Sequence, residues 1–445
     1  MSQVVYVVHC VDTEGPVDET LTATFERVEH AFGVSIEPSL ENLERLRRKE
    51  IDLNGGEDAC CLMVSTEALA YNNNWAKIDD MLAEALSEGF RNELPDSFGG
   101  GWIYSWFCMD HIGYELNPRK RDIGFHNIFE KYQLALATAP SQNDEMGFHI
   151  HPLPFNRQGN LCATHHFSND NRLFEILARR ILDHSWFPSC NRPGFHVTRP
   201  ESHWFWEQFV PFDYASQSYD IDEQEQNDLA NGRFGDWRRA PITWRPYRPA
   251  HDDYQVEGDC RRWIFRCLNM NSRIRNLRQE DVDLAFAESR EGKPVVLSFT
   301  DHDYRDIRAD VNQVRGLIDR AAKKYPDVQF KYCGAREAAR LALGLPQKNP
   351  CGVTLTLDNG VFHIRSDSPT FGPQPYFAMK TRDGRYFHDN LDFQKPFFEW
   401  SYTFDESTFD VSALEKAGVA ACDDTGNVSV AVMDMSSGVQ TDRYW

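Results

Sequence analysis

Basic residues and paired cysteines are both scarce in this sequence. Its 445 residues include 47 lysines and arginines against 68 aspartates and glutamates, which gives a formal net charge of −21. Nucleic acids and anionic membrane surfaces are bound through clusters of basic side chains, so this balance argues against both as partners. The 11 cysteines contain no Cys-x-x-Cys pair, which argues against a zinc site built from thiolates and favours reduced, buried thiols.

Long apolar runs are absent as well. The apolar run nearest the start covers only residues 4–8, whereas a helix that spans a membrane needs about 20 apolar residues. The first residues also lack the basic segment and the small-residue cleavage site of a secretory signal. We therefore expect a cytoplasmic protein without a transmembrane segment.

Strand and helix patterns alternate through the first 345 residues. Apolar stretches predict strands at residues 4–11, 102–109, 145–151, 295–299 and 328–332. Amphipathic patterns predict helices at residues 39–49, 75–89, 124–138, 171–184, 308–324 and 335–345. Repeated strand–helix units favour a barrel or a parallel sheet, so the fold class is α/β.

The pattern changes after Pro350. Residues 353–364 alternate apolar and polar side chains around an Asn359-Gly360 turn, a strong hairpin signal. We therefore predict two domains, a barrel with insertions at residues 1–348 and a small β-sandwich at residues 351–445. The polar stretch at residues 216–260 is expected to be an insertion or a long loop.

Two pairs of chemically active residues lie at the ends of predicted strands. Asp12 and Glu14 follow the first strand, and His149 and His151 end the strand at residues 145–151. Residues two apart on an extended chain point to the same side, so each pair can share a pocket. The carboxylates could serve as a base and a metal ligand, and the imidazoles could chelate one divalent ion. Taken alone, each pair is also compatible with an exposed turn.

Two further segments carry an arginine and a histidine. Arg192 lies in a Pro-Gly turn, where it could pair with a carboxylate and keep it ionised. His302 follows the strand at residues 295–299 between Asp301 and Asp303, and neighbouring acids would raise its pKa and suit it to general-acid catalysis. An exposed arginine and an acidic loop are the alternatives. The ends of parallel strands meet at one rim of a barrel, so the occurrence of all four segments at strand ends predicts that they form one site.

The order of these segments resembles the polysaccharide-deacetylase superfamily, of the NodB-homology or carbohydrate esterase 4 type. The similar segments, which run from the first to the last motif of that family, are residues 11–16, 145–152, 191–195, 212–216, 298–302 and 333–341. The resemblance covers roughly residues 4–345. It implies a distorted (β/α) barrel and one divalent metal ion, with zinc expected first and cobalt or nickel as alternatives.

The resemblance also implies roles for residues at matching positions. Asp12 would be the general base, Arg192 would orient it, and His302 would be the general acid. The metal ligands would be Glu14, His149 and His151. Residues near the motifs would contact the substrate, namely Trp102, Asp110, Phe195 and His196, although core packing is the alternative for the aromatic side chains.

The activity implied is metal-dependent removal of an N-acyl group, acetyl in the first place, from an amino sugar. A surface polysaccharide, an O-antigen, or their nucleotide- or lipid-linked precursors would carry that sugar. The chain departs from the usual second motif at position 153, which is Leu rather than histidine, and Glu14 stands where the family has aspartate. Two alternatives stay open: an inactive carbohydrate-binding protein, and a hydrolase of cyclic amides or formyl groups.

Overall fold

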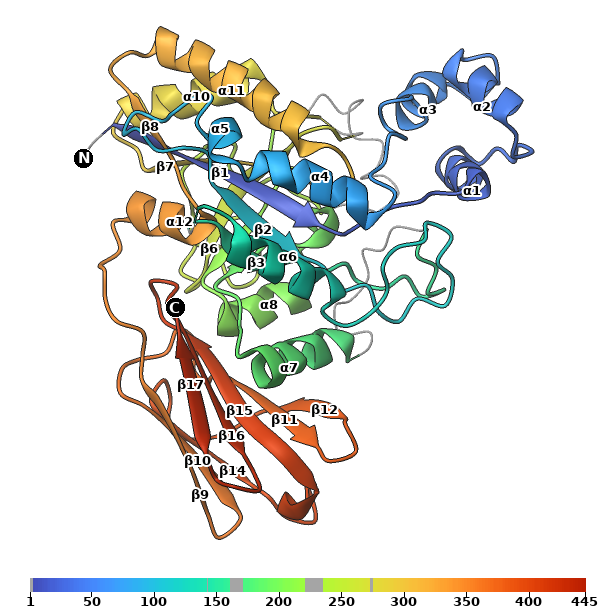
Figure 1. The fold of residues 1–445 in the computed structure, drawn as a ribbon. Coiled ribbons are helices and arrows are strands. Elements are labelled where there is room, and N and C mark those ends of the chain that lie inside the picture. The colour runs from blue at the N-terminus through green and yellow to red at the C-terminus, as the bar shows by residue number, and fades with distance from the viewer. Residues whose placement is uncertain (1–2, 142, 161–170, 221–234, 273–274) are drawn as a thin grey trace.

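The first part of the chain forms a closed barrel of parallel strands. The computed structural model describes residues 3–141, 143–160, 171–220, 235–272 and 275–445. Seven strands follow the order β2-β3-β4-β5-β6-β7-β1, and pairing of β1 with β2 closes the barrel (Figure 1). Their bounds are β1 Val4–Thr13, β2 Tyr104–Cys108, β3 Glu145–Phe148, β4 Cys190–Asn191, β5 Phe212–Ser216, β6 Trp263–Asn269 and β7 Val295–His302.

Strand β1 is the hub of the barrel. It pairs with β7 along most of its length, with β2 through its carboxyl half, and with β8 (Gln329–Tyr332) through its amino half. Successive side chains of a strand point to opposite faces, so Cys10 and Asp12 share one face of β1. Cys10 belongs to an interior cluster with Phe107, Tyr214 and Phe265, which places that face inside the barrel.

Helix α12 (Ala335–Leu343) closes the amino end of the barrel. Its first residue, Ala335, donates its backbone N–H to Ser105 Oγ at 2.9 Å and accepts a hydrogen bond from the Tyr214 hydroxyl. Four alanines of α12 are buried, three of them completely or nearly so. Because this end is plugged by packed alanines, the polar residues at the opposite, carboxyl end are the ones left facing a cavity.

Other helices cover the outer wall. The predicted helices appear as α2 Leu40–Arg47, α4 Trp75–Ala85, α6 Asn127–Thr138, α7 Arg172–His184 and α11 Ile307–Lys324, joined by α5 Glu88–Arg91, α8 Pro200–Phe209 and α10 Gln279–Arg290. The existence and type of these predicted helices are confirmed. Within the described residues no helix is long and apolar enough to cross a bilayer. Of the stretch expected to be an insertion, residues 221–234 lie outside the described part of the chain.

A small helical lobe follows β1 and extends away from the barrel (Figure 1). It contains α1 (Leu21–Phe32), α2 and α3 (Glu57–Met63), and it has its own apolar cluster. The lobe leaves the carboxyl end of β1, so its first helix and the chain returning from it can contribute side chains to whatever lies at that end.

Two antiparallel sheets make up the C-terminal region. One has the order β13-β14-β10-β9 and the other β12-β11-β15-β16-β17, and the two sheets share one apolar cluster. Their bounds are β9 Val353–Asp358, β10 Val361–Ser366, β11 Tyr376–Thr381, β12 Tyr386–Asp389, β13 Asp392–Lys395, β14 Glu399–Thr403, β15 Leu414–Cys422, β16 Val428–Asp434 and β17 Gln440–Tyr444. The expectation of an α/β barrel followed by a β-rich region is confirmed.

Helix α7 joins the two parts. The Tyr376 hydroxyl donates to the carbonyl of Phe174 at 2.8 Å, and the Tyr386 hydroxyl donates to Asp183 at 2.6 Å. One apolar cluster runs from the barrel through Leu177 and Ile181 to Val430. The strong amphipathicity that predicts this helix thus reflects burial against both the barrel and the C-terminal sheets.

Three buried ionisable residues lie between the outer wall of the barrel and α11. His9 Nε2 and Asp301 Oδ1 are 2.9 Å apart, and Asp310 of α11 faces them. Burial, and then the nearby Asp301, raise the pKa of Asp310 to about 8. In the unfolded chain this pKa would be about 3.9. Between these values the folded protein keeps a proton that the unfolded chain releases.

The pKa of Asp310 predicts a loss of stability with rising pH. The contribution is fully present below about pH 4 and is lost as pH rises to about 8, by up to about 1.4 kcal/mol per pH unit. Asp310→Asn removes this titration, so its stability relative to wild type should increase between pH 5 and pH 8 in urea unfolding. The control is Asp319→Asn, on the same helix but partly exposed. A constant difference across this range would contradict the raised pKa.

Candidate active site

A polar cavity lies at the carboxyl end of the barrel strands. The sequence-predicted residues that line it are Asp12, Glu14, His151, Arg192, Phe195, His196 and His302. They come from the ends of β1 and β7 and from the segments after β3 and β4. The structure thus brings these segments together as predicted. His149 is buried, with its Nε2 3.8 Å from Oε1 of the cavity residue Glu14.

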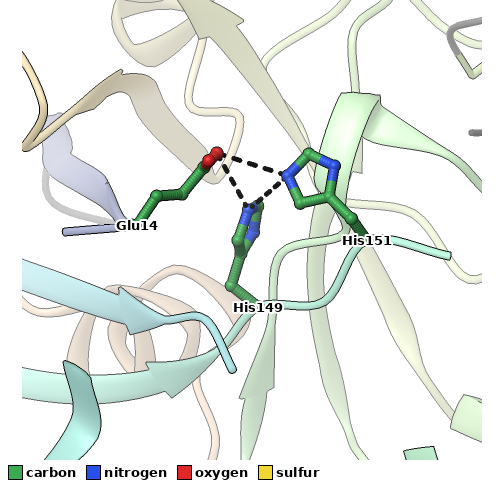
Figure 2. A group of neighbouring side chains, drawn as sticks. All are labelled: Glu14, His149 and His151. Atoms are coloured by element: carbon green, nitrogen blue, oxygen red, sulfur yellow. Dashed lines mark hydrogen bonds and ion pairs between the residues drawn. The ribbon is translucent and has the colours of Figure 1, made fainter. Parts of the chain in front are cut away.

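Three of these residues could hold a metal ion. Glu14, His149 and His151 point toward one another from β1 and from the segment after β3 (Figure 2). The two Nε2 atoms are 3.1 Å apart, and Glu14 Oε1 lies 3.3 Å from His151 Nε2 and 3.8 Å from His149 Nε2. Ligand atoms about 2.1 Å from one ion in a tetrahedral arrangement lie about 3.4 Å from each other. The three atoms thus have the spacing of one face of such a site.

Backbone contacts hold the two imidazoles in place. Arg192 donates its backbone N–H to the carbonyl of Phe148, and Gly194 donates to that of Ile150, each at 2.9 Å. His149 Nδ1 donates to the carbonyl of Arg192 at 2.6 Å, which leaves the lone pair of Nε2 directed at Glu14 and His151. A Cβ on Gly194 would lie 2.4 Å from the His151 ring, so glycine is required for that ring to fit.

Glu14 is held as an anion. Burial alone would raise its pKa, but the Arg121 guanidinium, followed by the two imidazoles, holds the pKa of this carboxyl well below its usual range. Arg121 Nη1 donates to Glu14 Oε2 at 2.5 Å, while Oε1 faces the histidines. An ionised carboxylate with one free oxygen is a suitable ligand for a divalent cation.

Asp12 lies beside this group, fully buried. It forms an ion pair with Arg192. Its Oδ1 is 3.6 Å from His149 Nδ1, and its Oδ2 is 3.5 Å from His302 Nε2. Burial raises the pKa of Asp12 to about 7, against the opposing effects of Arg192 and His149. Arg192 also donates to His196 Nε2 at 3.0 Å, so the guanidinium is fixed from both sides.

The expected raised pKa of His302 is wrong. Burial lowers the pKa of His302 well below its usual value, against the opposing effect of Glu14. Its two acidic neighbours do not face it, because adjacent residues on a strand point to opposite sides. Asp301 faces His9 on the outer wall, and Asp303 accepts hydrogen bonds from the backbone N–H groups of Glu14 and Gly15. His302 therefore faces the cavity as a neutral imidazole.

Phe195 and His196 reach the cavity through an unusual backbone. Both have positive φ, 52° and 54°, in the left-handed region that non-glycine residues seldom adopt. The Phe195 ring packs edge-on against His151 with 4.4 Å between the ring centres. His196 Nε2 lies 3.1 Å from Asn269 Oδ1. Strain of this kind is typical of functional sites.

Trp102 and Asp110 lie away from the cavity, contrary to the substrate-binding role expected for them. Trp102 precedes β2 and packs on the outer wall, where its indole N–H donates to His9 Nδ1 at 3.1 Å. Asp110 is buried beneath α7 and accepts a hydrogen bond from Arg180 Nη2 at 2.8 Å. Both faces of a buried parallel strand are apolar, so the sequence does not show which face turns inward.

Asp110→Ala should lower stability rather than alter the site. It would leave Arg180, which is completely buried, without its carboxylate, and breaking a buried ion pair costs about 3–5 kcal/mol. The measurement is urea unfolding together with the metal content of the folded protein. The control is Asp79→Ala, which removes an exposed ion pair with Lys131. Unchanged stability with a weakened substrate affinity would restore the substrate-binding prediction.

Several cavity residues carry no signal in the sequence. They come from helix α1, the end of β6 and several loops, and they are Arg27, Tyr71, His111, Arg119, Arg121, Asn269, Tyr304 and Arg305. Arg121 and Asn269 contact the predicted residues Glu14 and His196 directly. Only their position after folding identifies them.

Fold and site together define the class of protein, an α/β barrel with a buried carboxylate–imidazole group that could hold a metal ion. No family model and no curated protein matches the sequence. Among solved structures, it is similar to Clostridium perfringens alpha-toxin isolated from avian strain SWCP, at 14% identity and a TM-score of 0.12. The match covers 32% of this chain and 48% of the toxin chain, about half its length. So low a TM-score carries no argument about fold or function.

Proposed function

We propose that this protein is a metal-dependent hydrolase that removes an N-acyl group, acetyl in the first place, from an amino sugar. The observation that carries the proposal is the triangle of Glu14, His149 and His151 beside the buried Asp12–Arg192 ion pair. A metal-ligand face next to a carboxylate in one cavity is the arrangement that metal-assisted hydrolysis requires. The resemblance of the motif order to polysaccharide deacetylases supports the choice of substrate.

The donor set suits a divalent transition metal. One carboxylate oxygen and two imidazole nitrogens are typical ligands of catalytic zinc, and cobalt and nickel accept the same donors. An ion bound there would supply Lewis-acid chemistry, polarising the acyl carbonyl and acidifying a nearby water.

Residues of the chain would move the proton. Asp12 would accept a proton from the attacking water while Arg192 holds its carboxylate in place. His302 Nε2 lies 3.5 Å from Asp12 Oδ2, so the proton can pass between them and then reach the amine as the C–N bond breaks. The lowered pKa of His302 makes its protonated form a strong acid, which suits donation to a leaving amine.

Phe195 would offer an apolar ring face to the sugar. It is half-buried, lines the cavity and packs against the candidate ligand His151. A sugar of a surface polysaccharide or O-antigen, or its nucleotide- or lipid-linked precursor, is the substrate class we propose. None of the described residues of the C-terminal sheets lines this cavity.

Acetate release tests the proposal. The purified protein is stripped with a chelator, reloaded with zinc, cobalt or nickel, and incubated with an N-acetyl amino sugar, its nucleotide-linked form, an O-acetyl ester, an N-formyl sugar and a cyclic amide. Metal-dependent release of acetate from the N-acetyl sugars is the expected result. Hydrolysis confined to the formyl sugar or the cyclic amide would show that the protein is an amidase of another class. Sugar binding without hydrolysis would favour a carbohydrate-binding protein.

A further inference from the structure

The cavity carries an excess of positive charge in a protein whose net charge is −21. Five arginines and two acidic residues line it. Arg121 and Arg192 are paired with Glu14 and Asp12 in the candidate active site. The other three arginines, which we call the arginine cluster, lie beyond it and are Arg27, Arg119 and Arg305.

One carboxylate serves two members of the arginine cluster. Glu19 accepts hydrogen bonds from Arg27 Nη1 at 2.6 and 2.5 Å, and its Oε2 lies 2.9 Å from Arg119 Nε. All three side chains are largely buried, with Arg27 and Arg119 exposed by 12% and 14%. Among the described residues, two guanidiniums that share one carboxylate leave one positive charge without an anion.

Arg305 adds a second uncompensated charge. Its guanidinium donates to the backbone carbonyls of Ala68 at 2.9 Å and Asn271 at 3.4 Å. Within the described residues it forms no ion pair. A guanidinium that is partly removed from water and paired only with neutral groups costs free energy, which an anion from outside the chain would recover.

Two tyrosine rings connect the arginine cluster to the candidate active site. The Arg119 and Arg305 guanidiniums lie 5.5 and 5.4 Å from the centre of the Tyr71 ring. Tyr71 contacts Tyr304 with 5.9 Å between ring centres, and Tyr304 stacks on His302 at 4.7 Å. The excess charge therefore lines the same cavity as His302 and is linked to it through the Tyr71 and Tyr304 rings.

We propose that the arginine cluster binds an anionic group of the substrate, a carboxylate or a phosphate, so that the amino sugar is an acidic one. This inference rests on the proposed function for the identity of the sugar. Arginine matches both anions through paired N–H donors, and such charge-assisted hydrogen bonds are about twice as strong as neutral ones. A sugar anchored there by its acidic group would extend its N-acyl group toward His302 and Glu14.

Calorimetric titration of the purified full-length protein tests the inference with three probes: N-acetylglucosamine, its 6-phosphate, and an N-acetylated aminouronic acid. One or both anionic probes should bind at least about 10-fold more tightly than the neutral sugar. The anionic probe that binds more tightly shows whether the arginine cluster prefers a phosphate or a carboxylate. Equal affinity for all three probes, or binding of none, would overturn the inference.

Variants assign the effect to the arginine cluster. Arg305→Gln should weaken binding of the anionic probe by about 10- to 100-fold and leave binding of the neutral sugar unchanged. Arg305→Lys keeps the charge and should keep most of the affinity for the anionic probe. The control is Arg320→Gln, an exposed arginine of α11. Equal losses for charged and neutral probes would overturn the assignment.

Anion binding without acetate release would refute the proposed function alone, and equal acetate release from neutral and acidic sugars would refute this inference alone.

Discussion

Replacing both His149 and His151 by alanine is expected to abolish binding of a divalent ion, from about one per chain to a trace. The change removes two of the three candidate ligands and leaves Glu14 paired with Arg121. A single carboxylate already engaged by a guanidinium cannot hold a transition metal tightly. The measurement is metal content by mass spectrometry after loading with zinc, cobalt or nickel and desalting. Acetate release should disappear together with the metal.

The matched control for metal binding is His363→Ala. His363 is an exposed histidine on β10 of the C-terminal sheets, so its loss should leave the metal content unchanged. A wild-type protein that takes up none of the three ions would contradict the metal site, as would a double variant that keeps its metal. Either result would exclude hydrolysis that depends on a metal ion bound by Glu14, His149 and His151.

Asp12→Asn is expected to lower acetate release by about 1000-fold while the protein keeps its metal. A positioned general base contributes about 100- to 10,000-fold, and asparagine cannot accept the proton. Asp12 is not one of the three candidate ligands, Glu14, His149 and His151, so the metal should remain bound. The amide has the same shape and can still accept a hydrogen bond from Arg192. The readouts are the initial rate of acetate release and the metal content of the same preparation.

The pH profile gives an independent measure of the base. Burial raises the pKa of Asp12 to about 7, and only the deprotonated carboxylate can accept a proton. A bound cation would lower this pKa, so the rate should stay level at and above about pH 7 and fall as pH drops through a lower value. The control is Asp58→Asn, an acidic residue that is 84% exposed. Loss of metal from Asp12→Asn would make Asp12 a ligand, and a normal rate would exclude it as the base.

Local sequence patterns account for most of the barrel framework. The apolar runs that end in acidic or histidine residues correspond to β1, β3 and β7. The amphipathic stretches correspond to α4, α7 and α11, because apolar side chains three and four apart must be buried together. Helices α1 and α3 of the lobe were not predicted, and they bury a small apolar cluster of the lobe rather than the barrel core.

The spacing of residues within one strand end was enough to predict the candidate ligands. His149 and His151 are separated by one residue, as are Asp12 and Glu14, so each pair could be expected to face one pocket. Which side faces the pocket is not local information. Asp301 and Trp102 carry chemistry that suits a site, yet both face the outer wall, where they contact His9.

The sequence by itself determined an α/β framework with a β-rich region after it, and the residue types that converge at the carboxyl ends of the strands. Only the tertiary structure decided that Glu14, His149 and His151 form one triangle and that burial lowers the pKa of His302. It also decided that Arg27, Arg119 and Arg305 line the same cavity as these groups. Barrel closure brings together residues hundreds of positions apart, and the charge and solvation of each group depend on those neighbours rather than on its own segment.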